Sequence, residues 1–220
     1  MKTAMRKYEF TGETKTLCDG TVLHRIRALI DIDLGWRVVK AGELGGWLEK
    51  EGNLSHIGNC WVYDNAKVFG DAEVYGNAEV CGDAKVWGDA EVCDNAEVCG
   101  DAEVRGNAEV CGDAHVFDKD HVLVIGPIGS RSDFTTFMRN KSGEILVKCG
   151  CFFGTADEFL TKVQNTHGDS KHAVVYCSAV ALAVEQIDTT PETEDEISAT
   201  NHIADDACGS WIMQRFTKTE

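Results

Sequence analysis

Valine recurs at every sixth position through the middle of the chain, from Val62 to Val122. Alanine stands four residues after each valine up to Val110. Gly or Asp stands two residues after each valine up to Val116. An α-helix needs apolar positions about 3.6 residues apart, which this period does not supply. A period of six suits one short strand and one corner, with valine and alanine pointing inward. Three such sides close a triangular coil.

The second position after each valine holds only residues that suit a corner, namely Gly70, Gly76, Gly82, Gly88, Gly100, Gly106, Gly112, Asp64, Asp94 and Asp118. Glycine, and less readily Asp, tolerates the positive φ of a tight turn. The pattern V-x-G-[DN]-A-x resembles the hexapeptide-repeat family, and this resemblance implies a left-handed parallel β-helix with about 18 residues per turn. We therefore predict a mainly β protein whose coil spans residues 60–122 in about three and a half turns.

Residues 1–59 are predicted to form a small β-rich cap on the start of the coil. The alternating segment that begins at Tyr8 indicates a hairpin, with Asp19 and Gly20 in its turn. The residues expected to cover the open end of the first turn, which would otherwise expose strand edges, are Trp47 and Leu48.

Residues 123–187 are predicted to form a small α+β domain at the other end of the coil. Three strand candidates precede a helix that opens at Thr155, where Glu158 completes a capping box, and a second, apolar helix follows. Residues 188–220 are acidic and poor in apolar side chains, which is typical of a disordered tail. The WIMQRF segment near its end is a candidate docking peptide.

Longer stretches resemble hexapeptide-repeat proteins encoded by bacteriophages and prophages. These stretches are KYEFTGET, GELGGWLEKEGNLS, IGPIGSRSDFTTF, CGCFFGTADEF and THGD, so the resemblance spans roughly residues 7–187. Such proteins are labelled as transferases or as polymer-forming from the repeat alone. The resemblance therefore implies the fold more firmly than it implies an activity.

The formal net charge is −16, and most of it lies in the coil and the tail. Residues 62–122 hold 15 acidic and 4 basic side chains, a net charge of −11. Such a surface repels phosphate backbones, so direct nucleic-acid binding is not expected. The alternative, that the acidic coil imitates a nucleic acid toward a basic protein, stays open.

The ten cysteines are predicted to be reduced thiols. The N-terminal segment lacks the apolar stretch of a secretory signal, and no CxxC pair occurs. No apolar run approaches the ~20 residues that span a bilayer. These features favour a protein of the host bacterial cytoplasm with no membrane contact.

Stacking the repeats one turn apart aligns outward side chains in columns. One column holds Tyr63, Cys81, Cys99 and Phe117, and a second begins with Phe69 and Trp87. Contiguous exposed apolar patches are uncommon on soluble monomers. We expect the aromatic members of both columns to be covered by another subunit, in a homotrimer as the resemblance implies, or by the C-terminal domain. The alternative is that such side chains simply suit strand surfaces.

The segment from Gly126 to Arg131 is a glycine-rich, locally basic patch in an acidic chain. Gly126 and Gly129 let backbone amides approach an anion, while Ser130 and Arg131 add donors. Strand side chains expected to face the same spot are Thr135, Thr136 and Lys148. We predict that this patch binds a small anion such as a phosphate or nucleotide group. The alternative is a plain turn.

His115 is the one histidine at a repeat position, which makes it the candidate general base of an acyl-CoA-dependent acyltransferase. Acyl transfer is the commonest activity that the family resemblance implies. However, the repeats lack the loop insertions that shape such active sites. His115 also shares its phase with Lys and Glu, which is typical of a solvated face. A single coil histidine disfavours a zinc site of the γ-carbonic anhydrase type.

No metal or cofactor is predicted. The carboxylate columns are expected to bond local backbone amides at the corners, as Asp71 with Asp89 and Asp83 with Asp101. Cys149 and Cys151 alternate through one residue and are expected to be small side chains on one strand face, with a redox or soft-metal pair as the alternative.

The preferred prediction is a non-enzymatic, phage-type trimeric scaffold. It would bind or sequester a nucleotide-like ligand, or inhibit a host defence protein. An acyltransferase and a DNA-mimic inhibitor are the alternatives.

Overall fold

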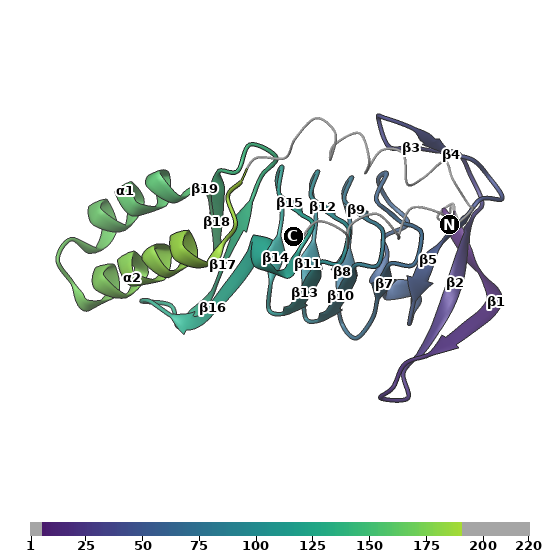
Figure 1. The fold of residues 1–220 in the computed structure, drawn as a ribbon, viewed down its shortest axis with the longest axis horizontal. Helices are drawn as coiled ribbons and strands as arrows, with labels where there is room; N and C mark the ends of the chain where they lie inside the picture. The colour runs from purple at the N-terminus through teal and green to yellow at the C-terminus, as the bar shows by residue number, and fades with distance from the viewer. Residues whose placement is uncertain (1–5, 191–220) are drawn as a thin grey trace, which may run out of the picture.

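A computed structural model describes residues 6–190 and shows a β-helix with a hairpin at one end and a sheet with two helices at the other (Figure 1). The predicted mainly β fold is confirmed. Within the described residues, no helix is long and apolar enough to cross a membrane.

Three faces of parallel strands make up the coil. The first face stacks β5 (Leu44–Leu48), β7 (Lys67–Val68), β10 (Lys85–Gly88) and β13 (Glu103–Gly106). The second face stacks β8 (Glu73–Val74), β11 (Glu91–Val92) and β14 (Glu109–Val110). The third face stacks β6 (Trp61–Val62), β9 (Glu79–Val80), β12 (Glu97–Val98) and β15 (His115–Val116).

The repeat sets the register of the stack. Val68 pairs with Val86 and Val86 with Val104, so each turn advances by one 18-residue unit. The inward valines and alanines are at most 1 % exposed, and burying each valine contributes about 1.5–3 kcal/mol. Corner residues take positive φ, including Asp64 and Asp94.

Asp118 is an exception among the predicted corner residues. Its φ is −134°, and its side chain accepts a hydrogen bond from Lys119 N–H at the start of the short 3₁₀ helix η2 (Lys119–His121). The coil ends at this point because the chain leaves the six-residue pattern.

The first turn begins at β5, before the point that the valine repeat indicates. Trp47 pairs with Lys67 and Leu48 with Val68, and Leu54 forms a parallel bridge with Val74. These pairs are offset by 20 residues instead of 18, because the loop between Leu54 and β6, which follows the short helix η1 (Glu51–Asn53), is two residues longer than the equivalent segment of later turns. Trp47 and Leu48 therefore belong to the first of four turns instead of covering it.

The N-terminal hairpin extends the first face of the coil. Its strands β1 (Tyr8–Thr16) and β2 (Val22–Ala28) are antiparallel, as predicted, and β2 also pairs antiparallel with β5. One six-stranded sheet therefore runs from β1 to β13. A smaller hairpin, β3 (Ile32–Asp33) and β4 (Val38–Val39), follows β2.

The C-terminal unit is an antiparallel sheet with two helices. Its strands are β16 (Val122–Ile128), β17 (Asp133–Arg139), β18 (Ile145–Cys149) and β19 (Phe152–Thr155), and its helices are α1 (Ala156–His167) and α2 (Lys171–Gln186). The third strand expected from the sequence is in fact two, β18 and β19. The capping box of Thr155 and Glu158 at the start of α1 is confirmed.

The two faces of this sheet serve different cores. Phe137 and Val147 pack with α1 and α2, whereas Met138 and Leu146 join the core of the coil. The chain is still anchored at Asp188, where the tail was expected to begin, because its N–H donates to the carbonyl of Asp120. The WIMQRF segment lies outside the described residues.

Candidate functional site

A pocket opens in the C-terminal unit, where the loop between β16 and β17 meets the first turn of α2. Its volume is about 330 Å³. The lining residues are Pro127, Ile128, Gly129, Ser132, Lys171, His172 and Val175. Three of the seven lining residues, Pro127, Ile128 and Gly129, therefore belong to the glycine-rich segment predicted to bind an anion.

Gly129 is needed by the backbone of this loop. Its φ is +70°, and a Cβ there would lie 1.9 Å from the hydroxyl oxygen of Tyr176. Tyr176 is 5 % exposed in the core between the sheet and the helices, and burial raises the pKa of its hydroxyl. The loop therefore rests directly on α2, which fixes the distance between the two walls.

The start of α2 gives the pocket its positive character. Ser170 caps the helix by accepting a hydrogen bond from Ala173 N–H, and Lys171 and His172 follow in the first turn. The first N–H groups of a helix have no partners within the helix and favour an anion nearby. The lining contains a lysine and no carboxylate, although the whole chain carries a net charge of −16.

The other members of the predicted loop lie around the pocket without lining it. A Cβ on Gly126 would meet the Phe134 ring, and a Cβ on Gly150 would lie 3.1 Å from a guanidinium nitrogen of Arg131. Ser130 and Arg131 are exposed at the loop tip. Arg131 thus reaches toward the turn after β18.

Thr136 and Lys148 are cross-strand partners that both contact Glu109, whereas Thr135 lies on the opposite face, so the three residues do not all meet at one spot as expected from the sequence. Thr135 donates to the Cys149 sulfur, whereas Thr136 accepts from Glu109 N–H of the coil. The two threonines are neighbours on β17, so their side chains point to opposite faces. Lys148 forms an ion pair with Glu109 at 3.2 Å and donates to the carbonyl of Gly150.

His115 is buried, so its expected place on a solvated face is wrong. Its side chain is 3 % exposed, and its Nε2 lies 3.0 Å from Glu97 Oε2. Lys141, in the turn between β17 and β18, donates to Glu97 Oε1 at 2.7 Å. Burial raises the pKa of Glu97, but the hydrogen bonds from His115 and Lys141 outweigh it and leave that pKa lowered. A histidine oriented by a carboxylate is an arrangement that can accept a proton.

Glu79 lies one turn before Glu97 on the same face. It accepts hydrogen bonds from Trp36 Nε1–H at 3.1 Å and from the Tyr63 hydroxyl at 3.0 Å. Glu79 is 6 % exposed, and this burial raises its pKa to about 7. The segment between β3 and β4 therefore covers this part of the third face.

The residues expected at a subunit interface have different surroundings. Tyr63 is 7 % exposed and lies beneath the Arg37 guanidinium, and Phe117 packs edge-on against His115. Tyr63 is therefore covered within its own chain, whereas Phe117 is only half-buried. The rings of Phe69 and Trp87 are parallel, with their centroids 5.8 Å apart, and both side chains are partly exposed.

The expectation that every cysteine is a reduced thiol is wrong. Cys81 and Cys99, on successive turns of the third face, form a disulfide. Cys149 ends β18 and Cys151 lies beyond it, so the two do not share one strand face. Of the acidic columns, Asp71 pairs with Lys50.

Sequence reasoning missed the residues that the fold brings together from distant segments. Lys171 and His172 line the pocket only because α2 packs against the β16–β17 loop. Glu97 and Lys141 joined His115 through the docking of the C-terminal sheet. The basic pair at the start of α2 is the one sequence signal that could have suggested the pocket.

The six-residue repeat and its four stacked turns define a β-helix protein with a capping α+β unit. No known family model matches the chain. The chain is similar to the uncharacterized acetyltransferase YdcK of Escherichia coli (strain K12), with 40 % identity over 74 residues, which is 30 % of this chain. The match covers 22 % of that protein's length.

Proposed function

We propose that this protein is a β-helix scaffold whose C-terminal unit binds a small anionic ligand, of the phosphate or nucleotide type, in the pocket at the start of α2. The observation that carries this proposal is the meeting of Gly129, Lys171 and His172 around one cavity. The ammonium group and the first N–H groups of α2 favour negative charge. The apolar wall of Pro127, Ile128 and Val175 suits the flat face of a base or another apolar group.

Thermal unfolding tests this proposal with inorganic phosphate, pyrophosphate, AMP and a cyclic dinucleotide as probes. We expect at least one probe to raise Tm in the wild type, because binding to the folded state stabilises it. Lys171→Ala is expected to weaken binding about tenfold, since a charged hydrogen bond is lost. The absence of a shift with all four probes would overturn the proposal.

Two further variants sharpen this test. Lys162 is an exposed lysine on α1 outside the pocket lining, so Lys162→Ala should leave the shift unchanged. Arg131→Ala separates the pocket from the loop tip, because the Arg131 guanidinium lies toward Gly150. A larger loss in Arg131→Ala than in Lys171→Ala would move the ligand from the pocket to the loop tip and contradict our placement.

The biological role that we propose is the capture of a nucleotide-like signal, or the inhibition of a host defence protein, in a bacterial cytoplasm. Support for this role comes from the resemblance to phage-encoded repeat proteins. We also propose that the chain forms a homotrimer through the partly exposed stack of Phe69 and Trp87. Sedimentation of the wild type and of a Trp87→Glu variant tests the trimer, which the variant should dissociate.

Acyl transfer is the second candidate, and the His115–Glu97 pair is the observation that favours it. The similarity to an uncharacterized acetyltransferase adds support. Because His115 is 3 % exposed at its side chain, a substrate would reach it only if the Lys141 turn moved away. Acetyl-CoA turnover that disappears in both His115→Ala and Glu97→Gln would establish this activity. Turnover that survives both changes would exclude this pair as its base.

A further inference from the structure

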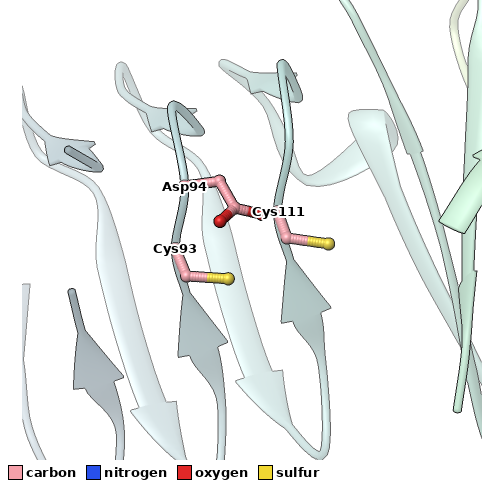
Figure 2. A group of neighbouring side chains, drawn as sticks. All are labelled: Cys93, Asp94 and Cys111. Carbon is pink, nitrogen blue, oxygen red and sulfur yellow. The ribbon is translucent and has the colours of Figure 1, made fainter. Parts of the chain in front are cut away.

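A second pair of cysteines lies on the second face of the coil, one turn apart. Cys93 follows β11 and Cys111 follows β14, and Cys93 N–H donates to the carbonyl of Val110 at 2.9 Å. The pair is almost enclosed, with 9 % of Cys93 and 4 % of Cys111 exposed. Figure 2 shows the two sulfurs pointing in the same direction from neighbouring turns, with the Asp94 carboxylate beside them.

The two cysteine pairs of the coil are built alike. A tyrosine precedes each pair by one turn, and its hydroxyl donates to a glutamate of the following turn, as Tyr63 to Glu79 and Tyr75 to Glu91. The first pair, Cys81 and Cys99, is joined as a disulfide, whereas Cys93 and Cys111 are free.

The two cysteine pairs differ in the residue at the neighbouring corner of the coil. Gly82 and Gly100 form the corners beside the disulfide, but the corner after Cys93 is Asp94, at a φ of +58° that disfavours a side chain. Asp94 Oδ2 accepts a hydrogen bond from Gly112 N–H at 3.2 Å, which leaves the other carboxylate oxygen available. Among residues 6–190, Cys93, Asp94 and Cys111 are the one set of three potential ligands whose donor atoms all lie within 4.8 Å of one another.

A lysine ammonium lies beside the two sulfurs. Lys148 lies close enough to interact with both sulfurs while it holds Glu109.

We propose that Cys93, Cys111 and Asp94 form a binding site for a thiophilic divalent cation, and that the physiological ion is Zn²⁺. Thiolate sulfur and carboxylate oxygen are both zinc ligands, and a site with three protein ligands leaves the fourth position to water. Tetrahedral bonds of about 2.3 Å place two sulfurs about 3.8 Å apart, so closure around the ion needs a shift of at most about 1 Å.

Zinc binding at this site needs neither an oxidant nor a reductant. Zinc forms bonds to both sulfurs and to the carboxylate, and the thiol protons pass to solvent, so that up to two protons are released. Binding should therefore tighten as pH rises. Hard cations such as Mg²⁺ prefer oxygen ligands and should not compete.

Titration of the full-length, reduced chain with Zn²⁺, and with Co²⁺ as a spectroscopic probe, tests this site. We expect one equivalent to bind, with a thiolate-to-cobalt absorption band and with release of protons. Cys93→Ser combined with Cys111→Ser should abolish the band, whereas the matched change at Cys81 and Cys99 should keep it. A reduced wild type that binds no zinc, or a band that survives without Cys93 and Cys111, would overturn the proposal.

Asp94→Gly provides a test that does not depend on the cysteine variants folding. Glycine is the residue at most corners of this coil, so the variant should fold, and it removes only the carboxylate. We expect its zinc affinity to fall at least about tenfold. Asp64→Gly is the matched control, because Asp64 is the other corner aspartate at positive φ, and it has no free cysteine pair beside it. Equal affinities in Asp94→Gly and the wild type would overturn the three-ligand site.

Discussion

Lys141 donates a hydrogen bond to Glu97 at 2.7 Å, and this bond joins the turn between β17 and β18 to the third face of the coil. A bridge between Ala114 and Asn140 lies beside it. The C-terminal sheet is therefore held to the last turns of the β-helix by polar contacts as well as by the apolar core around Met138.

The contact between Lys141 and Glu97 should be measurable by a double-mutant cycle. Lys141→Ala and Glu97→Gln are expected to show a coupling of about 0.5–1 kcal/mol in urea denaturation, because both side chains are partly exposed. This coupling should shrink at high salt. Pairing Glu97→Gln with Lys162→Ala is the control and should give no coupling. A cycle that closes to zero at low salt would show that the two side chains do not meet.

Glu79 should make stability depend on pH. Burial raises its pKa to about 7 from the usual value of 4.5, so the folded state keeps a proton that the unfolded state loses. The free energy of unfolding should therefore fall as pH rises between about 4.5 and 7, with all of the loss present above pH 7.

Glu79→Gln removes this one-proton dependence. The variant should gain on the order of 2–3 kcal/mol relative to the wild type between pH 5 and pH 8, measured by denaturation at several pH values. Glu91→Gln is the matched control, since Glu91 accepts the same kind of bond from Tyr75 but is partly exposed. Parallel pH profiles of Glu79→Gln and the wild type would contradict the burial of a protonated carboxyl.

Two corner glycines separate the cost of backbone conformation from the cost of crowding between turns. Both have positive φ, but a Cβ on Gly76 would lie 2.9 Å from Asp94 N, whereas a Cβ on Gly106 meets nothing within 4 Å. Gly106→Ala should cost about 1–2 kcal/mol from φ alone. Gly76→Ala should cost at least about 1 kcal/mol more, as measured by chemical denaturation. Equal costs would mean that the turns are not packed this closely.

Thr136 is predicted to matter more than its neighbour Thr135, although both are almost fully buried. Thr136→Val removes the acceptor of Glu109 N–H and should cost about 1–3 kcal/mol, because a buried donor is left unpaired. Thr135→Val loses only a bond to sulfur, a weak acceptor, and should cost less than about 1 kcal/mol. Thermal and urea unfolding of the two variants decide between these outcomes.

The coil could be predicted from the sequence because its information is local and repeated. Each six-residue unit contains its own corner residue and its own inward valine and alanine. The offset between Val68 and Val86 follows from the period alone. The first turn was missed for the same reason. Leu48 and Leu54 occupy inward positions, but the 20-residue offset that leads to them breaks the period.

The sites depend on contacts that no period encodes. Trp36 reaches Glu79 across 43 positions of sequence, and Lys141 reaches Glu97 across 44. The outward phase of the repeat looked solvated because Lys and Glu are usually exposed, yet docking of other segments buried Glu79 and His115. Part of the glycine-rich loop lines a pocket, but the basic residues of α2 that lie opposite could not be assigned before the helix was placed.

The bond between Thr136 and Glu109 has a consequence for assembly. In earlier turns the equivalent N–H, such as that of Glu91, donates to an alanine carbonyl of the next turn, so an uncovered last turn would accept a strand from another molecule. A hydroxyl from β17 occupies that position here, and the hairpin strands extend the sheet at the opposite end. These contacts occupy a backbone donor at one end of the coil and a strand edge at the other, so a strand from another molecule cannot pair at those two positions.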